Sequence, residues 1–211
     1  MRRLKLRELA QPYSAEDYYR CWTDIFPIDE KKERPYSVIV KRLCCYFSGD
    51  KRFETADLKL SKGIILFGGV GVGKSTLMQM FQRNAIFSYR LISCRDIESD
   101  FSVHGFETID KYSKLCDIAT NANPFGHQQI GYCFDDLGTE NAITKHFGNA
   151  KNVMADILLN RYDDKLDPRS THITTNLSVD EIEQFYGTRV IDRIRENFNM
   201  ITFDKDASSR R

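Results

Sequence analysis

The chain has 211 residues, and its 31 basic and 30 acidic side chains give a formal net charge of +1. No global field therefore marks it as a nucleic-acid coat or a membrane-surface protein, and any nucleic-acid contact has to be a local patch. The length suits one α/β domain with a sizeable core and a short appendage.

Membrane, secreted and zinc-binding classes are not expected. No stretch approaches the roughly 20 apolar residues of a membrane span, and the basic segment at residues 1–8 lacks the apolar run of a signal peptide. We therefore expect a soluble, cytoplasmic protein with no membrane partner. The six cysteines include no C-x-x-C pair and the four histidines share no ligand spacing, so neither a disulfide framework nor a zinc site is predicted.

Residues 1–55 are predicted to be helical and amphipathic. Ser14 with Asp17 three positions on resembles a capping box, after which aromatic side chains recur at helical spacing until Pro27. A second amphipathic helix opens at Pro35 and ends before a Gly-Asp pair. The aromatic side chains either pack on the rest of the protein or form a docking surface for a partner.

The next segment fits the phosphate-binding loop pattern G-x-x-x-x-G-K-[ST], between an apolar run at 64–67 and a helix-like stretch at 76–85. Glycines let main-chain amides face an anion, and the start of the helix adds partial positive charge. A plain glycine-rich turn before a helix is the alternative. The residues predicted to bind a nucleotide are Gly68, Gly69, Val70, Gly71, Val72, Gly73, Lys74, Ser75 and Thr76.

Strand-like and helix-like segments alternate through the remainder, which predicts a three-layer α/β P-loop fold around a parallel sheet. We assign residues 1–55 to a helical N-terminal extension, a candidate partner-docking region, and residues 56–211 to a P-loop ATPase domain. The predicted strands are 88–93, 130–135, 172–176 and 200–203; the predicted helices are 96–104, 108–120, 153–163, 179–185 and 190–196, with a turn at Asn123-Pro124 and a polar loop after residue 136.

The strand at 130–135 is largely apolar and leads into two carboxylates, Asp135 and Asp136. With one further strand expected between it and the loop strand, this is a Walker B arrangement. Mg²⁺ prefers oxygen ligands and bridges the β- and γ-phosphates, so the Ser75 hydroxyl and Asp135 are predicted to hold the metal. Asp136 could orient an attacking water. Acidic pairs at strand ends also occur without a function.

Two later segments carry further candidates. Asn176 ends a strand at the carboxyl edge of the sheet, where it could sense the γ-phosphate or hold the water; the alternative is a helix cap, which Asn also favours. Arg189 and Arg193 share a helix face. An outward-facing arginine there would reach a neighbouring subunit's nucleotide, whereas the ordinary interpretation is a solvated basic face paired with Asp192.

Four segments together resemble a known family. They are G-G-V-G-V-G-K-S (68–75), C-F-D-D-L-G-T-E (133–140), I-T-T-N-L (173–177) and Y-G-T-R-V-I-D-R-I-R (186–195). The series is similar to the bacterial replicative helicase loader family DnaC and to the related IstB-type transposition ATPases, which belong to the AAA+ class. The resemblance covers roughly residues 58–205, and the first 55 residues contain no motif that matches the family's helicase-docking region.

The resemblance implies an AAA+ core without the usual C-terminal helical lid, in keeping with the few residues that follow Phe203. It also implies that hydrolysis is slow and switch-like, because this chain and the loader group place Asp136 where many AAA+ enzymes have Glu; Glu140 is a second candidate for that role. The implied site comprises Lys74 on the β/γ-phosphates, Asp135 on Mg²⁺, Asn176 as sensor 1 and Arg193 as an arginine finger acting in trans, with Arg189 as the alternative finger.

The predicted function is an ATPase that uses ATP, Mg²⁺ and slow, DNA- or partner-stimulated hydrolysis to load or remodel a replicative helicase on single-stranded DNA, as a homo-oligomer in the ATP state. An IstB-type transposition helper acting on duplex DNA is the alternative. A small-molecule kinase is disfavoured because residues 138–150 contain only Lys145 as a cation, and a GTPase because the N-K-x-D motif is absent. A module that holds ATP without hydrolysing it stays open.

Overall fold

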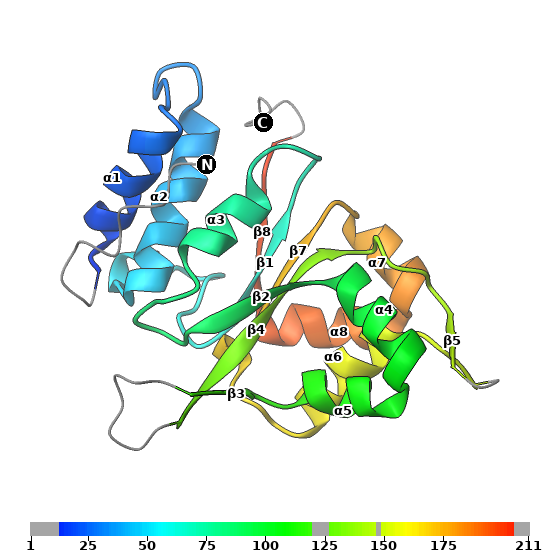
Figure 1. Ribbon diagram of the computed structural model, residues 1–211. Helices are drawn as coiled ribbons and strands as arrows, with labels where there is room; N and C mark the ends of the chain where they lie inside the picture. Colours follow the sequence, from blue (N-terminus) through cyan, green and yellow to red (C-terminus); the bar gives the residue numbers. More distant parts are fainter. Residues whose placement is uncertain (1–12, 120–126, 147–148, 205–211) are drawn as a thin grey trace.

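The computed structural model describes residues 13–119, 127–146 and 149–204. Its main feature is a twisted sheet with helices on both faces (Figure 1). Five strands run parallel in the order β2-β4-β7-β1-β8, and β3 pairs antiparallel with β4 at one side. These strands are β1 (Gly63–Phe67), β2 (Tyr89–Ser93), β3 (Cys116–Ala119), β4 (His127–Leu137), β7 (Thr171–Thr175) and β8 (Phe198–Thr202).

One face of the sheet is covered by three helices, α1 (Ala15–Ile25), α2 (Arg34–Ser48) and α3 (Lys74–Met80). Because successive strand residues point to opposite faces, Ile64 and Leu66 of β1 pack into the hydrophobic core on this side. The two N-terminal helices therefore share a core with the strand that leads into the glycine loop.

The opposite face is covered by five helices, and Ile65 and Phe67 of β1 pack into the core there. The prediction of a three-layer α/β fold with a mostly parallel sheet is confirmed, and β7 separates β1 from β4 as expected. The five helices are α4 (Cys94–His104), α5 (Phe106–Ser113), α6 (Val153–Asp163), α7 (Val179–Tyr186) and α8 (Thr188–Asn197).

The N-terminal helices form as the sequence predicts. Ser14 and Asp17 make the reciprocal capping box of α1, and Gly49 ends α2 with a left-handed backbone, φ 72°. Tyr18 and Trp22 are fully buried, and the Tyr18 hydroxyl donates to the carbonyl oxygen of Arg83 at 2.7 Å. These aromatic side chains thus pack inside the protein. The domain boundary at residue 55 stays a prediction.

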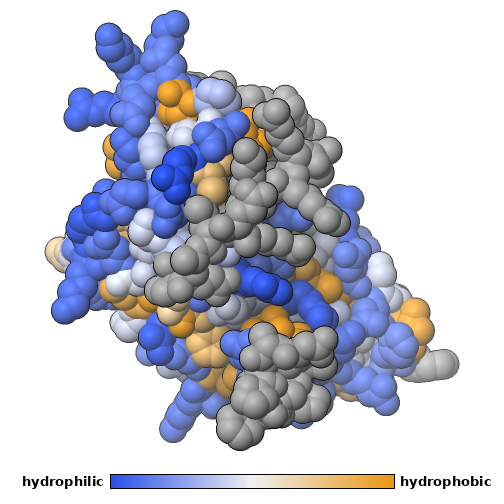
Figure 2. Space-filling view, turned by 60° about the vertical axis from the view of Figure 1, so that its left-hand side comes forward, coloured by the Kyte–Doolittle hydropathy of each residue, from blue (hydrophilic) through white to orange (hydrophobic). Residues whose placement is uncertain are grey.

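Figure 2 shows the face that carries these helices: its described surface is mostly hydrophilic, with small, scattered hydrophobic areas. Among the described residues, no helix combines the length and apolar character that crossing a membrane requires.

The helix predicted at 76–85 is shorter than expected and ends at Met80. Asn84 causes the early end, because its amide nitrogen donates to the carbonyl oxygens of Phe81 and Phe87 and its Oδ1 accepts from the amides of Ile86 and Phe87. The side chain thereby builds a turn in place of a further helical turn.

The helix predicted at 108–120 is wrong in its second half. α5 ends at Ser113, and the segment Cys116–Ala119 is strand β3. The buried guanidinium of Arg161 donates to the carbonyl oxygens of Tyr112 (3.0 Å) and Lys114 (2.7 Å), which diverts the chain out of the helix. β4 is also longer than predicted, since it begins at His127 to pair with β3.

The predicted polar loop after residue 136 contains a small hairpin, β5 (Thr144–His146) and β6 (Asn149–Lys151). Glu98 of α4 holds the segment before it, because its carboxylate accepts from the Asn141 main-chain amide (3.0 Å) and the Thr144 hydroxyl (3.1 Å). The turn predicted at Asn123-Pro124 lies outside the described residues.

His172 sits at the centre of the sheet. It is fully buried on β7, its ring packs against Tyr46, Phe47 and Tyr89, and its Nδ1 accepts a hydrogen bond from the Ile64 amide at 3.1 Å. Burial, together with the charge of Arg161, lowers the pKa of His172 to about 3. The ring is therefore neutral at physiological pH.

This burial predicts a specific pH dependence. The unfolded chain protonates His172 near pH 6.5 while the folded protein resists protonation down to about pH 3, so stability falls as pH falls through this window. From pH 6.5 to 5 the loss is about 2 kcal/mol. Urea denaturation of wild type and His172→Asn measures it: the variant has the smaller slope of unfolding free energy against pH. Equal slopes would contradict the assignment.

Candidate nucleotide-binding site

The loop between β1 and α3 follows the glycine pattern. Gly71 and Gly73 have φ values of 92° and 93°, a left-handed conformation that β-carbon-bearing residues avoid. A β-carbon placed on Gly69 would meet no atom within 4 Å, so the outer side of the loop is open. The geometry leaves room for a ligand against the main chain.

The Lys74 side chain folds back over this loop. The residue is only 5% exposed, and its Nζ donates to the carbonyl oxygens of Gly68 (2.7 Å) and Gly69 (3.0 Å) and to Asn176 Oδ1 (2.7 Å). Burial lowers its pKa, and the nearby charges of Asp136 and Asp135 partly oppose that shift. In the described part of the chain, no carboxylate accepts a hydrogen bond from this ammonium. A polyphosphate would provide the missing anionic partner.

Asp135 lies at the end of β4, within reach of the loop. Its Oδ1 accepts a hydrogen bond from the Thr174 hydroxyl at 2.6 Å, and the Ser75 side chain is close enough to lower the pKa of its carboxyl group. Burial raises the pKa of Asp135, against the influence of Thr174, Ser75 and the Lys74 charge. The structure thus brings Asp135 close to Lys74 and Ser75, although Asp135 lies 60 residues after Ser75 in the sequence.

Asp136 has an unusual backbone. Its φ is 56°, the register of β4 against β7 shifts between Phe134 and Leu137, and its amide donates to Thr174 Oγ1 at 2.9 Å. Asp tolerates this left-handed conformation better than most residues. The side chain is partly exposed and close enough to Lys74 and Asp135 to influence the pKa of both.

Asn176 follows the last residue of β7 and contacts Lys74 directly. It is not a helix cap: Ser178 caps α7, with a reciprocal capping box to Glu181. Of the two interpretations left open by the sequence, the structure therefore excludes the cap.

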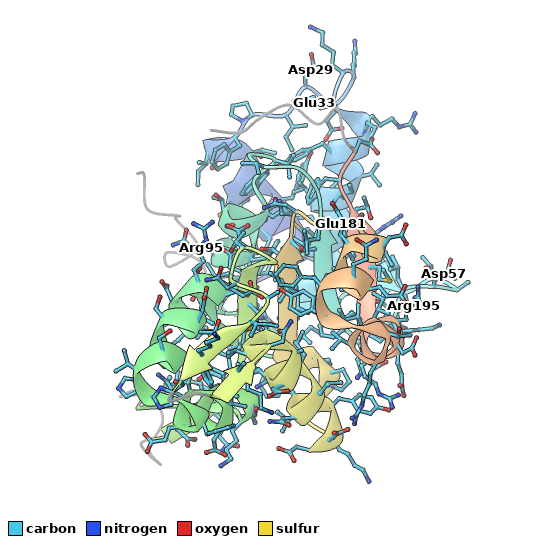
Figure 3. The ribbon with its side chains drawn as sticks, turned by 90° about the vertical axis from the view of Figure 1, so that its right-hand side faces the viewer. Asp29, Glu33, Asp57, Arg95, Glu181 and Arg195 are labelled. Carbon is cyan, nitrogen blue, oxygen red and sulfur yellow. The ribbon has the colours of Figure 1, made fainter. Side chains whose placement is uncertain are left out.

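Glu140, the second candidate for supporting hydrolysis, is almost fully buried. Its Oε1 accepts from the Tyr186 hydroxyl and its Oε2 from the Gly138 amide at 3.0 Å, and burial raises its pKa. Both oxygens are thus engaged in holding the loop after β4 against α7. Arg95 of α4 holds the same loop from the other side through the Thr139 carbonyl at 3.1 Å, and Figure 3 shows Arg95 and Glu181 on the helices that flank the strands.

The two candidate finger arginines do not join this cluster. Arg193 stacks on the Tyr162 ring of α6 at 4.1 Å and donates to Glu196 at 3.1 Å, and its side chain is 36% exposed. Arg189 pairs with Asp163 at 3.1 Å. Both arginines lie on α8 and contact α6. If either acts on a nucleotide, that nucleotide would be bound by a neighbouring subunit.

The donor set fits magnesium. Ser75 and Asp135 offer hard oxygen atoms, which Mg²⁺ prefers. Among the described residues, no group of three or more His, Cys, Asp or Glu side chains that could hold a metal ion is present. Mg²⁺ commonly binds through one or two protein oxygens together with phosphates and water.

The sequence did not predict that aromatic side chains of α1 and α2 contact the glycine loop. A β-carbon on Gly73 would lie 3.3 Å from the Tyr36 hydroxyl and 3.5 Å from the Trp22 ring. Tyr36 also packs on Phe203 after β8, at 5.4 Å between ring centroids. The helical spacing of the aromatic residues in α1 indicated that these rings are packed on one face, but it could not show that they contact the loop.

No protein-family model matches this sequence, and no curated protein is significantly similar to it. A comparison with solved structures gives partial likenesses. A crystal structure of the DnaC helicase loader is 16% identical, with a TM-score of 0.48 over 79% of this chain and 91% of that one. DnaI is 19% identical, with a TM-score of 0.48 over 86% and 89% of the two chains. AMPPCP-bound DnaA from Aquifex aeolicus is 15% identical, with a TM-score of 0.49 over 93% of this chain and 52% of that one.

The site predicts the effect of removing its buried charge. Lys74→Ala deletes the cation that would meet the phosphates, so affinity for AMPPCP with Mg²⁺ falls at least about 10-fold, the value of one charged hydrogen bond. Lys145→Ala, which removes the same charge from an exposed position on β5, leaves affinity unchanged. Isothermal titration calorimetry measures both. Equal affinities for Lys74→Ala and wild type would contradict the site.

Proposed function

We propose that the protein is an ATP-binding ATPase of the AAA+ class. The observation that carries the proposal is the buried Lys74 ammonium, held by neutral oxygens at the sheet edge where Ser75 and Asp135 also meet. A cation and two hard oxygen groups beside an open glycine loop suit a magnesium-bound triphosphate.

Each residue has a distinct task in this proposal. Lys74 binds the β/γ-phosphates, and the Ser75 hydroxyl and Asp135 carboxylate hold the Mg²⁺. A magnesium ion held there would neutralise charge that develops during phosphoryl transfer. Asp136, partly exposed beside them, orients the attacking water, and Asn176 turns from Lys74 toward the γ-phosphate.

The proposed biological role is that of a helicase loader, which rests on the four sequence segments that resemble the DnaC family. In this role the protein assembles on single-stranded DNA as a cytoplasmic homo-oligomer in the ATP state and places or remodels a replicative helicase. The alternative is an IstB-type transposition helper that acts on duplex DNA, because the same four segments also resemble that group.

Arg193 is the proposed arginine finger, and a subunit-mixing experiment tests it. Arg193→Ala lowers DNA-stimulated hydrolysis by up to about 10³-fold while AMPPCP affinity stays unchanged. Lys74→Ala subunits, which retain Arg193, restore activity when mixed with Arg193→Ala subunits, because each mixed interface joins an intact loop to an intact finger. Arg195→Ala, on the same helix and paired with Asp192, is the control.

A mixture with no more activity than its two components would exclude Arg193 as a residue acting in trans. Arg189→Ala, in the same assay, tests the alternative finger.

The loader proposal is tested by association and by DNA preference. With AMPPCP and Mg²⁺, the protein is expected to co-elute with the replicative helicase of its own host in size-exclusion chromatography, and its hydrolysis is expected to respond to single-stranded DNA more than to duplex. Lys74→Ala lacks the nucleotide-dependent co-elution. Stimulation by duplex DNA and no helicase association would instead favour the transposition helper.

A further inference from the structure

One buried hydroxyl connects both acidic residues of the site. Thr174 is fully buried on β7, and its Oγ1 lies 2.6 Å from Asp135 Oδ1 and 2.9 Å from the Asp136 main-chain nitrogen. The Asp136 amide can only donate, so the oxygen of Thr174 accepts there. The single hydroxyl proton is then directed to the Asp135 carboxylate.

The fold explains why the hydroxyl reaches both groups. β7 lies between β1 and β4; Thr174 is on β7, and Asn176 follows the last residue of that strand. Asn176 contacts Lys74 at the loop, while Thr174 contacts the end of β4. β7 and the residue after it thus contact the cation and both acids.

The Asp136 contact sits at the irregular point of β4. The register shift there leaves Asp136 without a partner residue on β7, and its amide donates a hydrogen bond to the Thr174 side chain instead. The left-handed backbone of Asp136 persists because neighbouring contacts hold it. Without the Thr174 hydroxyl the bulge loses one of these contacts, the one that holds the Asp136 amide.

We propose that Thr174 is a positioning residue of the ATPase site: its hydroxyl orients the Asp135 carboxylate toward the magnesium and holds the main chain of Asp136 in the left-handed turn that aims its side chain. The inference rests on the proposed function and adds a residue to it. Thr174 itself touches neither the metal nor the nucleotide.

Thr175 offers a matched control. It is equally buried on the same strand, and its hydroxyl also donates one hydrogen bond, to the Leu137 carbonyl at 2.7 Å, and accepts one, from the Leu177 amide at 3.0 Å. Neither partner is an acidic side chain. Thr174→Val and Thr175→Val therefore each remove one donated and one accepted hydrogen bond from the strand. Only Thr174→Val removes contacts with Asp135 and Asp136.

The test separates metal binding from nucleotide binding. Mn²⁺ affinity of the AMPPCP complex is measured by electron paramagnetic resonance, AMPPCP affinity without metal by calorimetry, and folding by urea denaturation. Thr174→Val weakens Mn²⁺ binding and slows hydrolysis about 10-fold or more, the value of a hydrogen bond to a charged group, with metal-free AMPPCP affinity within about twofold of wild type. Thr174→Ser keeps wild-type Mn²⁺ affinity and hydrolysis rate, and Thr175→Val changes neither of these two quantities.

Wild-type Mn²⁺ affinity and hydrolysis in folded Thr174→Val would overturn the inference while leaving the ATPase proposal intact. Equal losses in Thr174→Val and Thr175→Val would also overturn it, since they indicate a purely structural effect. Absence of AMPPCP binding by wild type would instead reject the ATPase proposal, and this inference with it. Should Thr174→Val not fold, Thr174→Cys, which keeps the shape but donates weakly, is expected to show the same losses at smaller size.

Discussion

The arrangement depends on a buried positive charge to which, among the described residues, no carboxylate is hydrogen-bonded. Lys74 is buried, its ammonium is met by two loop carbonyls and one side-chain amide, and burial lowers its pKa. Burying a charge is costly unless it is paired and hydrogen-bonded. The carboxylates of Asp135 and Asp136 help at longer range. In the proposed function, a polyphosphate supplies the anionic partner of this ammonium.

The strand order places the other side chains of the candidate site next to this charge. Because β7 lies between β1 and β4, side chains from the end of β4, from β7 and from the helix that follows β1 meet at one sheet edge. β7 supplies the connection, through Asn176 to the cation and through Thr174 to the acids. The N-terminal helices complete the arrangement from behind, where Trp22 and Tyr36 face Gly73.

The sequence predicts the parts of this structure that local pattern determines. The glycine loop, the apolar parallel strands, the capping box at Ser14 and the layer architecture follow from residue type and spacing. The early end of α3 at Met80 and the strand β3 do not, because the turn built by the Asn84 side chain and the hydrogen bonds from Arg161 on another helix decide them. The part played by Thr174 was equally hidden, since its partners are set by the register of β4 against β7.

The most direct measurement is a crystal structure grown with AMPPCP and Mg²⁺. The account predicts that Lys74 Nζ leaves the Gly68 and Gly69 carbonyl oxygens to contact the β- and γ-phosphates, with the metal between the phosphates, the Ser75 hydroxyl and Asp135. A nucleotide bound elsewhere, or one bound at the loop with Asp135 turned away from the metal and Lys74 still on the loop carbonyls, would contradict it.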